Sequence, residues 1–184
     1  MRFVIALVVA FAIPCYSVRA QESAAKSKVP PELVKNMAYY VGNWSVEGKL
    51  GDAPIKGKAS FRMPPGDHCL VGTVSFESAG EMYHFSVVSG WDSATGWFTE
   101  QGSASDGSLY RLHWRKVSET VEEGDLVGTL DGKEMTEKDR LERKGDDDFE
   151  VNCTERKAGD QNLPDQKFVY HRMPREKGKR KAEK

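Results

Sequence analysis

The alternation of hydrophobic and polar positions changes its period once, at Gly42. Before this glycine, Leu33, Met37 and Tyr40 lie three and four residues apart, which is the spacing of one face of a helix. Two prolines and Glu32 precede or open this segment, and such residues are typical of a helix start. The sequence therefore predicts a short helix with one apolar face.

From residue 43 onward the period is two. Trp44, Val46 and Leu50 alternate with polar residues, as expected for an antiparallel strand with one solvated face. Further alternating segments follow, each bounded by turn-forming Gly, Asp, Asn or Pro residues. We predict these strands near 56–63, 68–77, 81–91, 97–104, 108–117, 120–131, 133–144, 147–156 and 166–173.

The order of these elements predicts an all-β fold. No segment between the strands has the pattern of a crossover helix, so the strands pair in antiparallel fashion. A long series of consecutive antiparallel strands closes on itself to remove its exposed edges. We therefore expect an up-and-down barrel of about 8–10 strands.

The stretch Gly42-Asn43-Trp44, which joins the helix to the first strand, resembles the start of lipocalin-like (calycin-like) barrels. The resemblance implies that the helix plugs one end of the barrel and that Gly42 and Trp44 form part of this structural plug. In that family the tryptophan often packs against an arginine of the last strand, which here is Arg172. The Thr-Asp-Tyr loop of the lipocalin carrier proteins is missing, so that branch is not indicated.

A closer resemblance is to uncharacterised exported bacterial proteins with a lipocalin-like domain of unknown function. Its motifs are LVKNMAYYVGNW, GWDSATGWF, DGKEM and DDDFEV, which occur in this order, and the likeness covers roughly residues 33–156. That family supplies no activity, so the resemblance implies a fold and an exported location only.

The N-terminal residues have the composition of a secretory signal peptide. Arg2 is followed by an apolar run and by the small-residue cleavage site Val18-Arg19-Ala20, and the run is too short to span a bilayer. A lipid anchor at Cys15 is the alternative. We predict export to the periplasm or the medium, with this division of the chain: signal peptide 1–20, disordered linker 21–29, barrel domain 30–174 and disordered basic tail 175–184.

The charge of the central region excludes one class of partner. Residues 21–174 hold 19 basic and 26 acidic residues, a net charge of −7. Such a chain repels a phosphate backbone, so nucleic-acid binding is not expected. No segment after the signal peptide is apolar enough to form a transmembrane helix. The oligomeric state cannot be derived from these patterns.

The two cysteines of the predicted domain fall on opposite faces of their strands. Cys69 alternates with the apolar Leu70, whereas Cys153 shares the face of Phe149 and Val151. We therefore expect Cys69 outside, Cys153 inside and no disulfide between them, although a β-bulge in either strand would reverse this.

Several ionisable residues fall on faces that the alternation assigns to the interior. Glu137 and Asp139 share the face of apolar neighbours in their strand, and Arg172 shares the face of Tyr170. Since a buried charge requires a partner or a ligand, Arg172 and Tyr170 are candidates for holding a carboxylate. Two alternatives remain: Arg172 stacks on Trp44 in a structural role, and the two acids lie beyond the barrel rim.

The interior aromatic residues would line a ligand cavity or fill a solid core. They are Phe61, Phe76, Tyr83, Phe85, Tyr110, Trp114 and Tyr170. We predict a protein that binds a small apolar or amphipathic molecule in the barrel, either a hydrophobic or a carboxylate ligand. The candidate binding residues are Tyr110, Trp114, Glu137, Asp139, Tyr170 and Arg172.

Other chemistry has less support in the sequence. There is no Gly-x-Ser-x-Gly motif, and the four histidines lack the spacing of metal ligands, so no catalytic residue, metal or cofactor is predicted. An enzyme that uses Glu137 or Asp139 as a base beside Arg172 is one alternative function. A solid-cored interaction module of the cell envelope is another.

Overall fold

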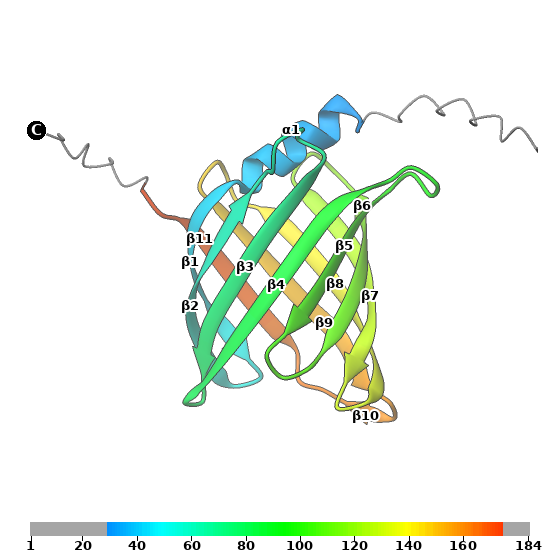
Figure 1. The fold of residues 1–184 in the computed structure, drawn as a ribbon. Helices are drawn as coiled ribbons and strands as arrows, with labels where there is room; N and C mark the ends of the chain where they lie inside the picture. The colour runs from blue at the N-terminus through cyan, green and yellow to red at the C-terminus, as the bar shows by residue number, and fades with distance from the viewer. Residues whose placement is uncertain (1–28, 175–184) are drawn as a thin grey trace, which may run out of the picture.

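The computed structural model describes residues 29–174, which form a single closed β-barrel with a helix across one end (Figure 1). The elements are α1 (Pro31–Tyr40), β1 (Gly42–Leu50), β2 (Ala53–Arg62), β3 (Cys69–Ser78), β4 (Glu81–Asp92), β5 (Trp97–Ala104), β6 (Leu109–Lys116), β7 (Val121–Leu130), β8 (Lys133–Arg143), β9 (Asp148–Ala158), β10 (Gln161–Asn162) and β11 (Gln166–Arg172).

Ten of these strands form the barrel wall. Each strand from β1 to β8 pairs antiparallel with the next, and β11 pairs with both β1 and β9. The pairing of β8 with β9 closes the sheet. The two-residue β10 pairs only with the end of β9, outside the ring. The predicted all-β, lipocalin-like barrel is confirmed, and the predicted strand ends differ from the observed ones by a few residues.

Helix α1 forms a plug over the barrel end at which β1 begins. Met37 and Tyr40 are buried, and Trp44 at the start of β1 is fully buried with 0% exposure. The Trp44 indole Nε1 donates a hydrogen bond to the Tyr40 carbonyl at 2.9 Å. The Arg172 guanidinium lies 4.1 Å from the centre of the Trp44 ring, a cation–π distance. Trp44 and Arg172 therefore make the contact at the plug that the resemblance implied.

Gly42 is required by the geometry of this junction. Its φ of +141° is one that L side chains rarely adopt, and a Cβ here would lie 3.2 Å from the Arg172 Nη1. The same Nη1 donates to the Val41 carbonyl at 2.9 Å, and Nη2 donates to the Tyr39 carbonyl at 2.7 Å. The Arg172 guanidinium therefore caps the C-terminal end of the helix, since these carbonyls have no partner within α1.

A second set of polar contacts fixes α1 to β7 and β8. Asn36 donates to the Glu122 carboxylate at 2.8 Å, and Arg143 bonds to the same carboxylate oxygen at 3.2 Å. The Arg143 guanidinium also lies over the rings of Tyr39 and Tyr40, at 4.5 and 5.1 Å from their centres. Burial, followed by the Glu122 charge, raises the pKa of Tyr40 above its ordinary value. Hydrogen bonds therefore hold α1 over this end of the barrel, and the Arg143 guanidinium neutralises the Glu122 carboxylate.

The predicted orientation of the cysteines is confirmed. Cys153 is buried, Cys69 is half-buried on the outer side, and both are free thiols. The predicted signal peptide (1–20), most of the linker (21–29) and the basic tail (175–184) lie outside the described residues. Within residues 29–174, the one helix is too short and too polar to span a bilayer.

Candidate functional site

The barrel encloses a cavity of about 510 Å³. The cavity runs from Tyr40 beneath the plug to Asp106 and Asp131 in the turns at the opposite end. All seven aromatic residues that the alternation placed inside contribute to its lining: Phe61, Phe76, Tyr83, Phe85, Tyr110, Trp114 and Tyr170. Its volume lies in the range of small-molecule sites, roughly 300–1,000 Å³. This cavity argues against a solid core, which the interaction-module alternative assumed.

The first polar group in the cavity wall is centred on Glu100 of β5. Its carboxylate accepts hydrogen bonds from the Tyr110 hydroxyl and the Ser89 hydroxyl, each at 3.0 Å. The Tyr110 ring reaches it because it lies across Gly102, where a Cβ would be 2.4 Å from a ring carbon. Burial raises the pKa of Glu100, although both hydrogen bonds oppose this shift. Burial and the Glu100 charge likewise raise the pKa of Tyr110.

The second polar group is a buried ion pair between β8 and β9. The Arg156 Nε donates to Glu137 Oε2 at 2.7 Å, and the two side chains are only 8% and 7% exposed. The Arg156 Nη1 also donates to the Pro164 carbonyl at 2.6 Å. The guanidinium is therefore engaged on two sides and neutralises one carboxylate of the cavity.

A β-bulge in β9 places Arg156 at this position. Thr136 pairs with Lys157 and Lys138 pairs with Thr154, so β9 contains one residue more than β8 over this interval. Glu155 adopts a positive φ of 52° and points outward, where it bonds to Lys138 at 3.2 Å. The extra residue reverses the alternation, and for this reason Arg156 faces inward.

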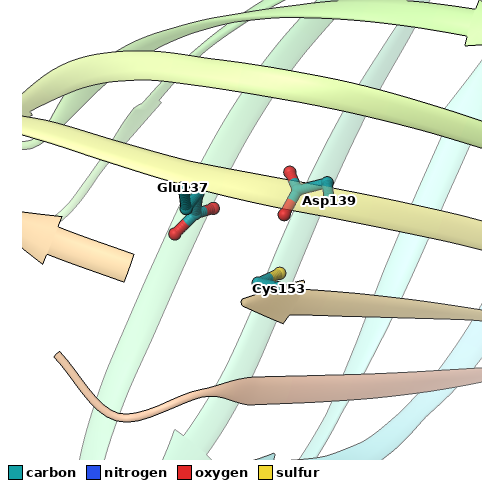
Figure 2. Close-up of side chains that lie close together, drawn as sticks. All are labelled: Glu137, Asp139 and Cys153. Carbon is teal, nitrogen blue, oxygen red and sulfur yellow. The ribbon is translucent and has the colours of Figure 1, made fainter. Parts of the chain in front are cut away.

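The third polar group consists of Asp139 and Cys153, which are direct partners across β8 and β9. Asp139 is 5% exposed and Cys153 is 4% exposed. Burial, followed by the nearby Glu137 charge, raises the pKa of Asp139 to about 8, while interaction with the Cys153 thiol opposes the shift. Burial and the charge of Asp139 raise the pKa of the Cys153 thiol. Figure 2 shows Glu137, Asp139 and Cys153 gathered on the inner wall.

Five of the six predicted binding residues meet in this cavity. Tyr110, Trp114, Glu137, Asp139 and Tyr170 all belong to its lining, so the alternative in which the two acids lie beyond the rim is wrong. Arg172 is the exception and a correction to the prediction. Its guanidinium contacts Trp44 and main-chain carbonyls at the plug, and Arg172 is absent from the cavity lining. An active site that pairs Glu137 or Asp139 with Arg172 is therefore not formed.

The prediction also missed polar residues of the cavity. Glu100 and Ser89 each follow the inward alternation of their strands, so parity with Phe98 and Val87 was sufficient to find them. Arg156 was hidden by the bulge, because strict alternation from Cys153 assigns Glu155 to the interior and Arg156 to the surface.

The charged residues of the lining are unequal in number. They comprise seven acidic residues and one basic residue: Glu81, Glu100, Asp106, Glu122, Asp131, Glu137, Asp139 and Arg156. Glu122 and Glu137 have guanidinium partners in Arg143 and Arg156. Glu100 and Asp139 have no such partner among residues 29–174. The cavity thus offers apolar walls together with hydrogen-bond acceptors and a negative potential.

Comparison with known proteins adds support for the fold. No protein-family model matches this chain, and no curated protein matches its sequence. Among solved structures, the chain is similar to the one described as the crystal structure of Rv2717c from M. tuberculosis. The similarity has a TM-score of 0.59 at 17% sequence identity and covers 79% of this chain and 99% of that chain. At this level of identity the likeness concerns the barrel fold alone.

Proposed function

We propose that this protein binds a small amphipathic molecule inside the barrel, with the apolar part of the ligand against the aromatic walls and a hydrogen-bond-donating or cationic group near Glu100 and Asp139. The observation that carries the proposal is the hollow interior of about 510 Å³, whose lining is apolar apart from an excess of acidic groups. Burial of apolar ligand surface supplies most of the affinity in such sites, and a few polar groups set the orientation.

The charge of the lining favours donors and cations over carboxylates. Arg156 is the one basic residue in the lining, and it is already bonded to Glu137 and to the Pro164 carbonyl. A carboxylate ligand would lie near Glu100 and Asp139, and carboxyl groups that share a low-dielectric site cannot all ionise without an energetic cost. Arg172, which the sequence suggested as the partner of a carboxylate ligand, does not belong to the cavity lining, and its guanidinium bonds to main-chain carbonyls at the plug.

The proposal includes an extracytoplasmic location, in the periplasm or in the medium. It is supported by the composition of residues 1–20 and by the resemblance of residues 33–156 to exported lipocalin-like proteins. Intact-mass measurement of the protein isolated from its own cells tests this part. A mature N-terminus at Gln21 is expected, and a chain that retains Met1 to Ala20 would contradict export by this signal.

Displacement of a neutral fluorescent dye tests the binding itself. Decylamine and decanoic acid share one alkyl chain and differ in the charge of the head group, so we would compare how well each displaces Nile red from the protein. We expect decylamine to bind at least about tenfold more tightly, equivalent to about 1.4 kcal/mol. Tighter binding of decanoic acid would contradict the proposed electrostatics.

Two neighbouring residues on β7 give a matched pair of variants. Leu126 points into the cavity and is 5% exposed, whereas Val127 points outward and is 53% exposed. Leu126→Trp should fill part of the cavity and weaken binding of the dye and of decylamine at least tenfold. Val127→Trp adds similar apolar surface outside and should leave both affinities unchanged. Equal effects of the two variants would place the dye on the outer surface and refute the proposal.

A further inference from the structure

Three side chains of types that can ligate metals lie close together on the inner wall: Glu137, Asp139 and Cys153 (Figure 2). One potential ligand atom from each residue lies within 4.8 Å of the other two. Asp139 and Cys153 are opposite each other in the β8–β9 register, and Glu137 precedes Asp139 by two residues on the same face of β8. The backbone geometry of the sheet therefore holds all three side chains together.

One buried oxygen in this set has no partner. Asp139 is 5% exposed, and its Oδ1 accepts no hydrogen bond from any residue that the structure describes. Leaving a buried polar atom unsatisfied costs roughly 1–3 kcal/mol, and more for a charged group. Such an atom, close to a second carboxylate and a thiol, points to a ligand that accepts electron pairs from all three.

We propose that Glu137, Asp139 and Cys153 bind one divalent metal ion of the zinc class on the inner wall of the barrel. Three protein ligands and a fourth position that faces the cavity are the usual arrangement of zinc sites open to a small molecule. The presence of a thiol favours Zn²⁺ over Mg²⁺ and Ca²⁺, which prefer sites made only of oxygen ligands.

The distances in the set are compatible with metal binding. Bonds of about 2.0–2.3 Å to oxygen and sulfur in tetrahedral geometry place the ligand atoms roughly 3.5 Å apart. Atoms that lie within 4.8 Å of one another need to approach by about 1 Å, which rotation of the side chains can provide. The Glu137 oxygen bonded to Arg156 is Oε2, so Oε1 is the second oxygen that this carboxylate offers.

The charges of the set also balance on metal binding. Two carboxylates and a thiolate carry three negative charges, which a divalent ion and the Arg156 guanidinium neutralise together. Arg156 bonds to Glu137 at 2.7 Å and is fixed by the Pro164 carbonyl at 2.6 Å. It would act as a supporting residue that orients a ligand, a role that commonly changes metal affinity roughly 10–100-fold.

Titration of the reduced, chelator-treated protein with Co²⁺ tests the site, because a thiolate bound to Co²⁺ gives a charge-transfer band in the near ultraviolet. We expect saturation at one ion per chain, reversal of the band by one equivalent of Zn²⁺, and one zinc per chain in native mass spectra. No stoichiometric binding of either ion would overturn the proposal.

The second free cysteine supplies the matched control. Cys153→Ser should abolish the charge-transfer band and weaken Zn²⁺ binding by at least about 100-fold, whereas Cys69→Ser, on the outer side, should leave both unchanged. A band that survives in Cys153→Ser or disappears in Cys69→Ser would overturn the assignment. If Cys153→Ser does not fold, as judged by circular dichroism, Asp139→Asn in a folded protein decides, because it should lower the affinity at least tenfold.

The metal test is independent of the proposed amphipathic ligand. Metal binding is measured without any organic ligand, and the dye and decylamine measurements are made in the presence of a chelator. Loss of one result with retention of the other therefore identifies which of the two proposals has failed.

Discussion

The buried ion pair between Arg156 and Glu137 allows a direct test of how burial alters the contribution of an ion pair to the free energy of unfolding. The substitution Arg156→Met keeps much of the side-chain volume and removes the charge. It leaves the Glu137 carboxylate, which is 7% exposed, without its guanidinium partner. Breaking a buried pair on one side typically costs about 3–5 kcal/mol. The lost bond to the Pro164 carbonyl acts in the same direction.

A surface pair on the same barrel provides the comparison. Arg140 bonds to Glu123 at 2.7 Å, the same distance as the buried pair, but these side chains are 48% and 39% exposed. Solvent-exposed pairs contribute about 0.2–1 kcal/mol. Arg140→Met should therefore reduce the free energy of unfolding by less than about 1 kcal/mol. The two variants differ mainly in burial, since distance and chemistry are shared.

Equilibrium unfolding in urea, with a chelator present, measures both effects. The double variant Glu137→Leu/Arg156→Met should recover most of the stability lost by Arg156→Met, because no uncompensated charge remains in the cavity wall. Losses of similar size for Arg156→Met and Arg140→Met would refute the reasoning. A double variant no more stable than Arg156→Met would show that the contact with Pro164, rather than the charge of Glu137, is responsible.

Three further predictions concern the plug, the cavity acid and the thiols. Trp44→Ala removes a fully buried ring and should lower the free energy of unfolding by about 3–5 kcal/mol in urea denaturation, whereas a loss below about 1 kcal/mol would contradict its place in the plug. Burial raises the pKa of Glu100 in the folded state, so its ionisation opposes folding once the pH exceeds 4.5, the ordinary pKa of a glutamate. Glu100→Gln should therefore be more stable than the wild type near pH 8 and equal to it near pH 4. Equal stability at both pH values would contradict the burial of this carboxylate. Thiol titration of the protein without residues 1–20 should detect Cys69 in the native state and both barrel cysteines, Cys69 and Cys153, after unfolding. Detection of neither would indicate a disulfide.

The alternation of side chains made most of the fold predictable. The inward positions of Tyr110 and Trp114 on β6, and of Glu137 and Asp139 on β8, followed from period two because these stretches contain no irregularity. The plug was implied instead by the resemblance of the Gly-x-Trp junction to the start of lipocalin-like barrels. The inward positions depend on residues close together in the sequence, for which local geometry is sufficient.

Features that depend on a change of local geometry were not predictable in this way. The bulge near Glu155 has no glycine to mark it, and it moves Arg156 from the outer face to the cavity. Arg172 shares the strand face of Tyr170, yet at the end of β11 its guanidinium reaches over the rim to the plug. Whether inward rings fill a barrel or line a cavity depends on their rotamers and on the barrel width, which a pattern of residue types does not contain.

Native mass spectrometry of the protein purified from its own cells, followed by extraction and identification of any bound molecule, tests whether the barrel holds a ligand. We expect one small molecule per chain with an apolar body and a cationic or hydrogen-bond-donating group. Its binding should be weakened by Leu126→Trp and retained in Val127→Trp. A chain that carries no organic molecule and does not bind decylamine in the displacement assay would contradict the assignment of the barrel as a ligand-binding cavity.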